Sequence, residues 1–262
     1  MPFLLPRGEK AFLAKVFDLA ARAREQAVDR VRLLALAGVD LELRHGAITA
    51  LVGANGSGKT TLLNVLAGHL PAASGHTSIA GRVAYVPQHK PMYKSFKVAD
   101  VLQFGRRMND VWDNDLADAW LARFKVPRRL QIGDLSGGQR TRLALALALG
   151  KRAELLLLDE PMADLDPLAR HQLMGTLMAE AAEHGTTVVM SSHIVGELAE
   201  TCDHLLLVSG GRVRLGGGID DLVNAHALVT GARPLTDLAA HTVVESHATG
   251  RGLTALVRPE GP

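Results

Sequence analysis

The chain has 262 residues, of which 47% are hydrophobic and 4% aromatic, and its formal net charge is +2. This length allows one full domain with a small appendage. The near-neutral charge argues against a dedicated nucleic-acid-binding protein, which normally carries a concentrated basic face. We therefore expect no nucleic acid among the partners.

Cysteine usage and hydropathy indicate a chain that works in a reducing compartment and does not span a membrane. The single cysteine, Cys202, has no partner for an internal disulfide, as is usual in the cytoplasm. No apolar run approaches the roughly 20 residues that a spanning helix needs. The apolar residues 3–5 are followed at once by Pro6 and Arg7, which argues against a secretion signal. A membrane role is thus expected only through a partner.

Strands and helices alternate along the chain, which predicts an α/β fold with a mixed or parallel sheet. Residues 9–35 carry apolar side chains at helical spacing. Segment 143–149 alternates Leu with Ala, but both are strong helix formers, so we predict a buried helix there. The other expected elements are two short strands within 39–52, a helix at 59–70, a strand at 83–86, helices within 98–126, and strands at 155–158, 188–190 and 205–208.

The segment 53–60 reads Gly-Ala-Asn-Gly-Ser-Gly-Lys-Thr and fits the phosphate-binding pattern G-x-x-x-x-G-K-[ST]. Its three glycines reach backbone angles closed to other residues, so the loop can wrap phosphates and aim N–H groups at them. Lys59 supplies positive charge for the outer phosphates, and the Thr60 hydroxyl suits Mg²⁺. The helix that follows points its N-terminus at the anion. The segment therefore predicts binding of a nucleoside triphosphate.

Two carboxylates follow the apolar segment 155–158, which has the character of a central parallel strand. Active sites in such sheets lie beyond the C-terminal ends of the strands. Asp159 suits Mg²⁺, directly or through water, and Glu160 suits the attacking water as a general base or its orienter. Taken alone, such a pair is more often ordinary solvated surface. With the phosphate loop upstream, it predicts a metal and catalytic site.

A third segment lies between these two motifs and comes just before a predicted helix. It resembles the signature sequence of the ATP-binding cassette (ABC) ATPases, and its residues are Leu135, Ser136, Gly137, Gly138 and Gln139. Three further positions match the family. Gln88 corresponds to the Q-loop glutamine, which contacts the metal and relays to the transport partner. Asp166 corresponds to the D-loop aspartate, and His193 to the switch histidine that holds the γ-phosphate.

The resemblance implies an ATP and Mg²⁺ site with defined residues. The implied nucleotide-binding residues are Gly53, Asn55, Gly56, Gly58, Lys59, Thr60 and Thr61. The implied metal ligands are Thr60, Gln88 and Asp159, and the implied catalytic residues are Glu160, His193 and Gln88. In this family two subunits dimerise head to tail, so the signature of one subunit caps the γ-phosphate bound by the other. The implied partners are a second copy of the chain and a separate polytopic permease, at the cytoplasmic face of the plasma membrane.

The resemblance extends over residues 39–215 and implies the P-loop ABC ATPase fold. We expect an ATPase domain at 39–226, with a helical subdomain at about 89–140 and a reduced antiparallel β subdomain. Residues 1–38 are expected to be a partly helical, atypical N-terminal extension. Residues 227–262 are expected to be a small C-terminal extension, either with strands at 242–244 and 253–257 or loosely ordered.

The chain departs from the family where an aromatic residue normally stacks on adenine. That position falls at Arg30, and no aromatic residue lies between Phe17 and Tyr85. Either Arg30 or Arg32 stacks its guanidinium on the base, or the base is held loosely. Selectivity for ATP over GTP is therefore implied only by the resemblance.

Short segments also suggest a branch of the family and help to weigh two alternative functions. Residues 166–170, Asp-Pro-Leu-Ala-Arg, look like the bacterial drug- and lipid-export branch. A non-transport ABC ATPase acting on DNA or ribosomes is one alternative. The short segment 61–134, without sustained heptads, argues against the DNA-repair type, and the single cassette argues against the ribosomal type. A regulator that binds nucleotide without hydrolysing it is the other alternative.

Overall fold

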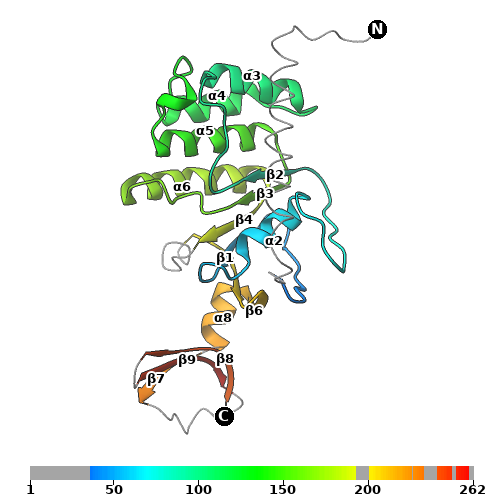
Figure 1. Ribbon diagram of the computed structural model, residues 1–262, viewed down its shortest axis with the longest axis vertical. Helices are drawn as coiled ribbons and strands as arrows, with labels where there is room; N and C mark the ends of the chain where they lie inside the picture. Colours follow the sequence, from blue (N-terminus) through cyan, green and yellow to red (C-terminus); the bar gives the residue numbers. More distant parts are fainter. Residues whose placement is uncertain (1–35, 193–200, 226, 233–240, 250–251, 260–262) are drawn as a thin grey trace.

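The computed structural model describes residues 36–192, 201–225, 227–232, 241–249 and 252–259 (Figure 1). Its centre is a six-stranded sheet in the order β2-β3-β4-β1-β5-β6. Neighbouring strands from β2 to β5 run parallel, and β6 is antiparallel to β5. The strands are β1 (Ile48–Val52), β2 (Val83–Val86), β3 (Leu155–Leu158), β4 (Thr187–Ser192), β5 (His204–Ser209) and β6 (Arg212–Gly218).

Helices cover both faces of this sheet because its central strands are apolar on both sides. In β3, Leu156 and Leu158 belong to a core shared with α5 and α6, whereas Leu155 and Leu157 belong to a second core shared with α2. The same alternation holds in β1. The helices before and after these strands are α2 (Lys59–Leu66), α3 (Val98–Met108), α4 (Asn114–Arg123), the 3₁₀ turn η1 (Ile132–Asp134), α5 (Gly137–Gly150) and α6 (Pro167–His184).

Local sequence signals explain where the two long helices begin and end. Ser136 caps α5, because its hydroxyl accepts a hydrogen bond from Gln139 N–H at 3.2 Å. Asp166 caps α6 in the same way, accepting from Ala169 N–H at 2.9 Å. That helix ends at Gly185, whose φ of +63° is the left-handed conformation that glycine adopts without strain.

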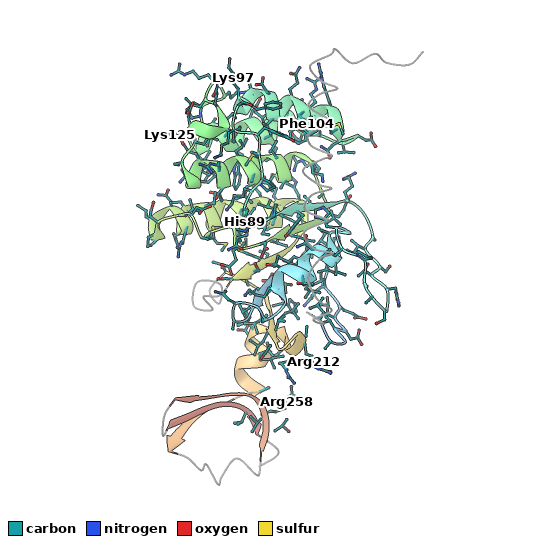
Figure 2. All side chains as sticks on the ribbon, in the orientation of Figure 1. His89, Lys97, Phe104, Lys125, Arg212 and Arg258 are labelled. Atoms are coloured by element: carbon teal, nitrogen blue, oxygen red, sulfur yellow. The ribbon has the colours of Figure 1, made fainter. Side chains whose placement is uncertain are left out.

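A second, smaller sheet follows the α8 helix (Ile219–Ala225). Its antiparallel strands are β7 (Ala227–Ala232), β8 (His241–Thr249) and β9 (Gly252–Pro259), in the order β7-β9-β8. Figure 1 places this sheet at the opposite end of the molecule from α3 and α4. The labelled side chains of Figure 2 show the same separation, with Lys97 and Lys125 at one end and Arg258 near the other. Both tail strands expected from the sequence lie inside β8 and β9.

The α/β fold class with a mixed sheet, a small antiparallel sheet and helices is confirmed. The predicted strands at 83–86, 155–158, 188–190 and 205–208 and the buried helix at 143–149 are also confirmed. The two-residue turn Gly210-Gly211 joins β5 to β6, with φ values of +56° and +72°. The division of the chain into three regions stays a prediction, and residues 1–35 of the expected N-terminal extension lie outside the described part.

Two expected elements are wrong in part. Only β1 forms within 39–52. Leu41 and Leu43 alternate and pack on the core under α2, but among the described residues their segment pairs with no strand. The helix expected at 59–70 ends at Leu66, because Gly68 turns the chain with a φ of +73°. Within the described ranges, no helix has the length and apolar character needed to cross a membrane.

Candidate functional site

Parallel pairing brings the two main sequence motifs to one edge of the sheet. β4 lies between β1 and β3, with Val52 opposite Ser192 and Leu158 opposite Met190. The phosphate loop leaves β1 at this edge, and the acidic pair leaves β3 at the same edge. The topology therefore assembles segments that lie about a hundred residues apart in the chain at the position where ligands bind in parallel sheets.

The phosphate loop is closed around the ammonium group of Lys59. Lys59 is only 6% exposed, and its Nζ donates hydrogen bonds to Gly53 O at 2.7 Å and to Ala54 O at 3.2 Å. Gly56 and Gly58 have φ values of +79° and +110°, which side-chain-bearing residues rarely adopt. The loop thus holds a buried positive charge at the start of α2, an arrangement suited to a phosphate anion.

The β5–β6 hairpin supports the other side of this loop. A Cβ atom on Gly53 would lie 2.2 Å from Val208 O, so only glycine fits there. Gly211 N–H donates to Ser57 O at 3.1 Å. The Ser57 hydroxyl is buried without a hydrogen-bond partner in the described part of the chain. The loop is therefore fixed by backbone contacts while this hydroxyl keeps its bonding capacity for a ligand.

The acidic pair after β3 is buried and held by one serine of β4. Asp159 is 1% exposed and Glu160 is 9% exposed. Ser191 Oγ donates to Asp159 Oδ1 at 2.7 Å and accepts from Glu160 N–H at 2.8 Å. Asp159 Oδ2 is buried and has no hydrogen-bond partner among the described residues. A buried carboxylate oxygen of this kind fits a cation, since Mg²⁺ prefers carboxylate ligands.

Tyr85 of β2 is a neighbour of this pair that the sequence argument missed. Burial and then the nearby negative charge of Asp159 raise the pKa of the Tyr85 hydroxyl. Asn64 Nδ2 of α2 donates to the same hydroxyl at 3.3 Å. Tyr85 stays protonated and lies between the acidic pair and the helix that follows the phosphate loop. The only sequence signal for this was its place one residue before the end of a strand that pairs with β3.

The remaining predicted site residues lie on other elements. Gln88 is exposed on the loop after β2, and the side chain of Asp166 caps α6. The signature residues 135–139 span the start of α5, with Ser136 as its cap and Gly137 as its first residue. His193 lies outside the described residues. The roles that the resemblance implies for all of these residues stay predictions.

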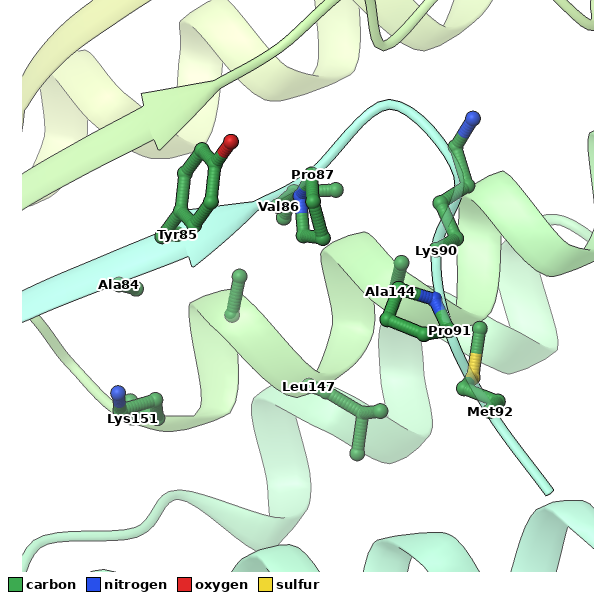
Figure 3. Close-up of a pocket in the computed structure, with 11 residues that line it drawn as sticks. Ala84, Tyr85, Val86, Pro87, Lys90, Pro91, Met92, Ala144, Leu147 and Lys151 are labelled. Atoms are coloured by element: carbon green, nitrogen blue, oxygen red, sulfur yellow. The ribbon is translucent and has the colours of Figure 1, made fainter. Parts of the chain in front are cut away.

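A cavity of about 220 Å³ lies next to the Gln88 loop, between β2 and α5. Figure 3 shows Lys90 and Lys151 at opposite ends of it, with Leu147 of α5 between them. Lys151 Nζ donates to Val83 O at 3.1 Å, and burial lowers the pKa of this lysine. Residues of β2, of the loop that follows it and of α5 line the cavity.

Fold and site together define a P-loop nucleotide-binding protein. A family model described as "ABC transporter" matches residues 36–163, which contain the phosphate loop, the signature and the acidic pair. Together with relatives that it matches at 34–39% identity over 67–75% of their own length, this shows that the chain belongs to the ABC transporter family, among its ATP-binding subunits.

Curated relatives come from transport systems of both directions. The chain is 39% identical over 203 residues to a hemin import ATP-binding protein of Streptomyces coelicolor, covering 70% of this chain and 72% of that protein. It is 38% identical over 183 residues to an aliphatic sulfonates import ATP-binding protein of Corynebacterium glutamicum, covering 68% of this chain and 75% of that protein. It is 34% identical over 211 residues to a Nod factor export ATP-binding protein of Cupriavidus metallidurans, covering 71% of this chain and 67% of that protein.

Solved structures agree with the fold. One, described as the ATP-binding subunit of an ABC transporter, matches with a TM-score of 0.65 at 24% identity, over 72% of this chain and 86% of that chain. Another is a dimeric ABC transporter cassette, with a TM-score of 0.64 at 21% identity, over 71% of this chain and 90% of that chain.

Proposed function

We propose that this chain hydrolyses ATP and thereby drives a separate membrane permease, to whose cytoplasmic side it binds. One observation carries the proposal: the buried Asp159–Glu160 pair leaves β3 at the sheet edge where the Lys59 loop leaves β1. Lys59 and the loop amides hold the phosphates, and Glu160 orients the attacking water and takes its proton. Thr60, Gln88 and Asp159 would hold Mg²⁺, which supplies positive charge against the phosphates.

The dimer is part of this proposal. The N–H groups of Gly137 and Gly138 at the start of α5 are helix-terminal donors outside the Ser136–Gln139 capping box, and these suit the γ-phosphate held by a second subunit. His193 is assigned to the same phosphate. A relative of the same fold is described as a dimeric cassette, which supports association of two copies. ATP binding then favours the closed dimer, and hydrolysis releases it.

Replacing Glu160 by Gln tests the assignment. The variant should bind MgATP in calorimetry with unchanged affinity, release no phosphate, and accumulate as an ATP-dependent dimer in size-exclusion chromatography. Glu154→Gln is the matched control, because Glu154 precedes the same strand at its opposite end and pairs there with Arg82 at 2.9 Å. The control should hydrolyse ATP like the wild type. Phosphate release that survives in Glu160→Gln would remove Glu160 from its proposed role.

For the direction of transport we propose export, on the resemblance of residues 166–170 to the export branch. Import is the second candidate, because the two relatives of 38% and 39% identity are described as import proteins. Proteoliposomes that contain the co-purified permease distinguish the two directions. With ATP only outside, the active transporters have their ATPase subunits outside, so an exporter fills the lumen with its substrate and an importer empties it. A preparation without any co-purifying polytopic protein would favour the non-transport alternatives.

A further inference from the structure

Lys90, on the loop after Gln88, is a buried lysine that the site described above does not use. The residue is 5% exposed, and its Nζ donates to Asp164 Oδ2 at 2.9 Å and to Gln88 O at 3.1 Å. An ammonium group so far from water needs a counter-ion, and Asp164 supplies it. The backbone of Lys90 has a φ of +43°, which is unfavourable for a residue with a side chain. We infer that the ion pair with Asp164 helps to hold the loop in this unfavourable backbone conformation.

Asp164 in turn lies against the start of the signature helix. A Cβ atom on Gly137 would be 3.0 Å from Asp164 Cβ, and one on Gly138 would be 2.8 Å from Leu165 Cδ2. Two glycines thus let segment 163–166 pack directly on the signature. Lys90 and Asp164 lie 74 residues apart in the chain, yet one ion pair joins the Gln88 loop to a segment in contact with the signature.

We propose that the Lys90–Asp164 pair is a positioning link that makes the Gln88 loop and segment 163–166 move together. If either loop moved alone, the ammonium would lose its counter-ion inside a poorly solvated site, which is costly. Joint movement keeps the pair intact. This inference rests on the proposed function, with the signature facing the second subunit and with Gln88 relaying to the permease as the family resemblance implies. The link then transmits a displacement at one interface to the other.

The two residues of the ion pair differ in exposure, so one of them can be replaced without leaving a buried, unpaired charge. The Lys90 side chain is 3% exposed, whereas the Asp164 side chain is 48% exposed. Removing the carboxylate would leave a buried ammonium unpaired, which destabilises the fold. Removing the ammonium leaves a carboxylate that water can reach. Lys90→Met therefore breaks the link and keeps the apolar stem in place. Lys90→Arg, which keeps the charge, is the conservative rescue.

The matched control is Lys151→Met, which removes a partly buried lysine at the other end of the same cavity (Figure 3). Lys151 bonds a backbone oxygen rather than a carboxylate. Its replacement should leave kcat, KM and the rate of amide hydrogen–deuterium exchange in segment 163–166 unchanged. Lys90→Met should lower kcat about fivefold, a coupling effect of ordinary size, with KM and ATP affinity unchanged. Lys90→Arg should restore most of kcat.

Hydrogen–deuterium exchange tests the link itself, independently of turnover. Lys90→Met should speed amide exchange in 163–166 and in signature residues 135–139 about threefold or more, beyond any change in the Gln88 loop. Unchanged exchange in both distant segments, or wild-type kcat in Lys90→Met, would overturn the proposal. A wild-type chain that releases no phosphate would contradict the proposed function instead, and the exchange data would still decide whether the link exists.

Discussion

Ser191 hydrogen-bonds both acidic positions, through Asp159 Oδ1 and Glu160 N–H, at 2.7 Å and 2.8 Å. It therefore fixes the carboxylate proposed to hold Mg²⁺ and the backbone of the proposed base. Ser191→Ala should lower kcat about tenfold, since a hydrogen bond to a charged group contributes about 1.5–3 kcal/mol. Phosphate release at saturating MgATP measures the effect.

The matched control for Ser191 is on the same strand. Thr187 is buried at the opposite end of β4, where its hydroxyl accepts from Gly46 N–H at 2.9 Å. Thr187→Ala should lower the melting temperature but leave kcat per folded molecule unchanged. Equal losses of kcat in both variants would show that the Ser191 effect is one of general stability.

Lys59→Ala should weaken MgATP binding more than tenfold, because it removes the charge proposed to hold the phosphates and also the bonds to Gly53 O and Ala54 O. Isothermal titration calorimetry measures the affinity. Circular dichroism shows whether the variant still folds. A folded Lys59→Ala variant with wild-type affinity would contradict the phosphate-loop assignment.

Gly53→Ala should destabilise the protein by about 2 kcal/mol or more, because the added Cβ would overlap Val208 O, a backbone atom that cannot move alone. Urea unfolding measures the change. Gly175→Ala is the contrasting variant. Gly175 is exposed within α6, and among the described residues no atom outside the nearby helix backbone lies within 4 Å of an added Cβ, so alanine should stabilise the helix by about 1 kcal/mol.

Cys202 should react with a thiol reagent far more slowly in the folded protein than in urea. Burial raises the pKa of its thiol from 9.0 to about 11, so the reactive thiolate is scarce at about pH 8. The unfolded thiol ionises at its ordinary pKa and the folded thiol only near pH 11. The protonated thiol therefore contributes fully to the free energy of unfolding below pH 9.0, and this contribution is lost as the pH rises through about 11. Ellman's reagent measures the rate, and Cys202→Ala gives the background. Equal rates in the folded and unfolded chain would contradict the burial of this thiol.

The sequence was informative where a short local pattern determines the structure. The phosphate loop and the apolar β3 strand both follow from neighbouring residues. Tyr85 beside Asp159 was not predictable, because it depends on β2 being the neighbour of β3. The strand expected before His45 does not form for a related reason: alternation shows which side chains are buried but not whether they pair with a strand, and among the described residues no strand pairs with this segment.

The cap on the signature helix has a consequence for how it would receive an anion. Ser136 Oγ accepts from Gln139 N–H, and Gln139 Oε1 accepts from Ser136 N–H at 3.0 Å. Accepting this bond uses a lone pair of the hydroxyl and leaves its proton available. The rotation of the hydroxyl-bearing side chain is thus restricted before any oxyanion arrives. An incoming phosphate oxygen would meet a preorganised O–H donor, and little rotational entropy would be lost on contact.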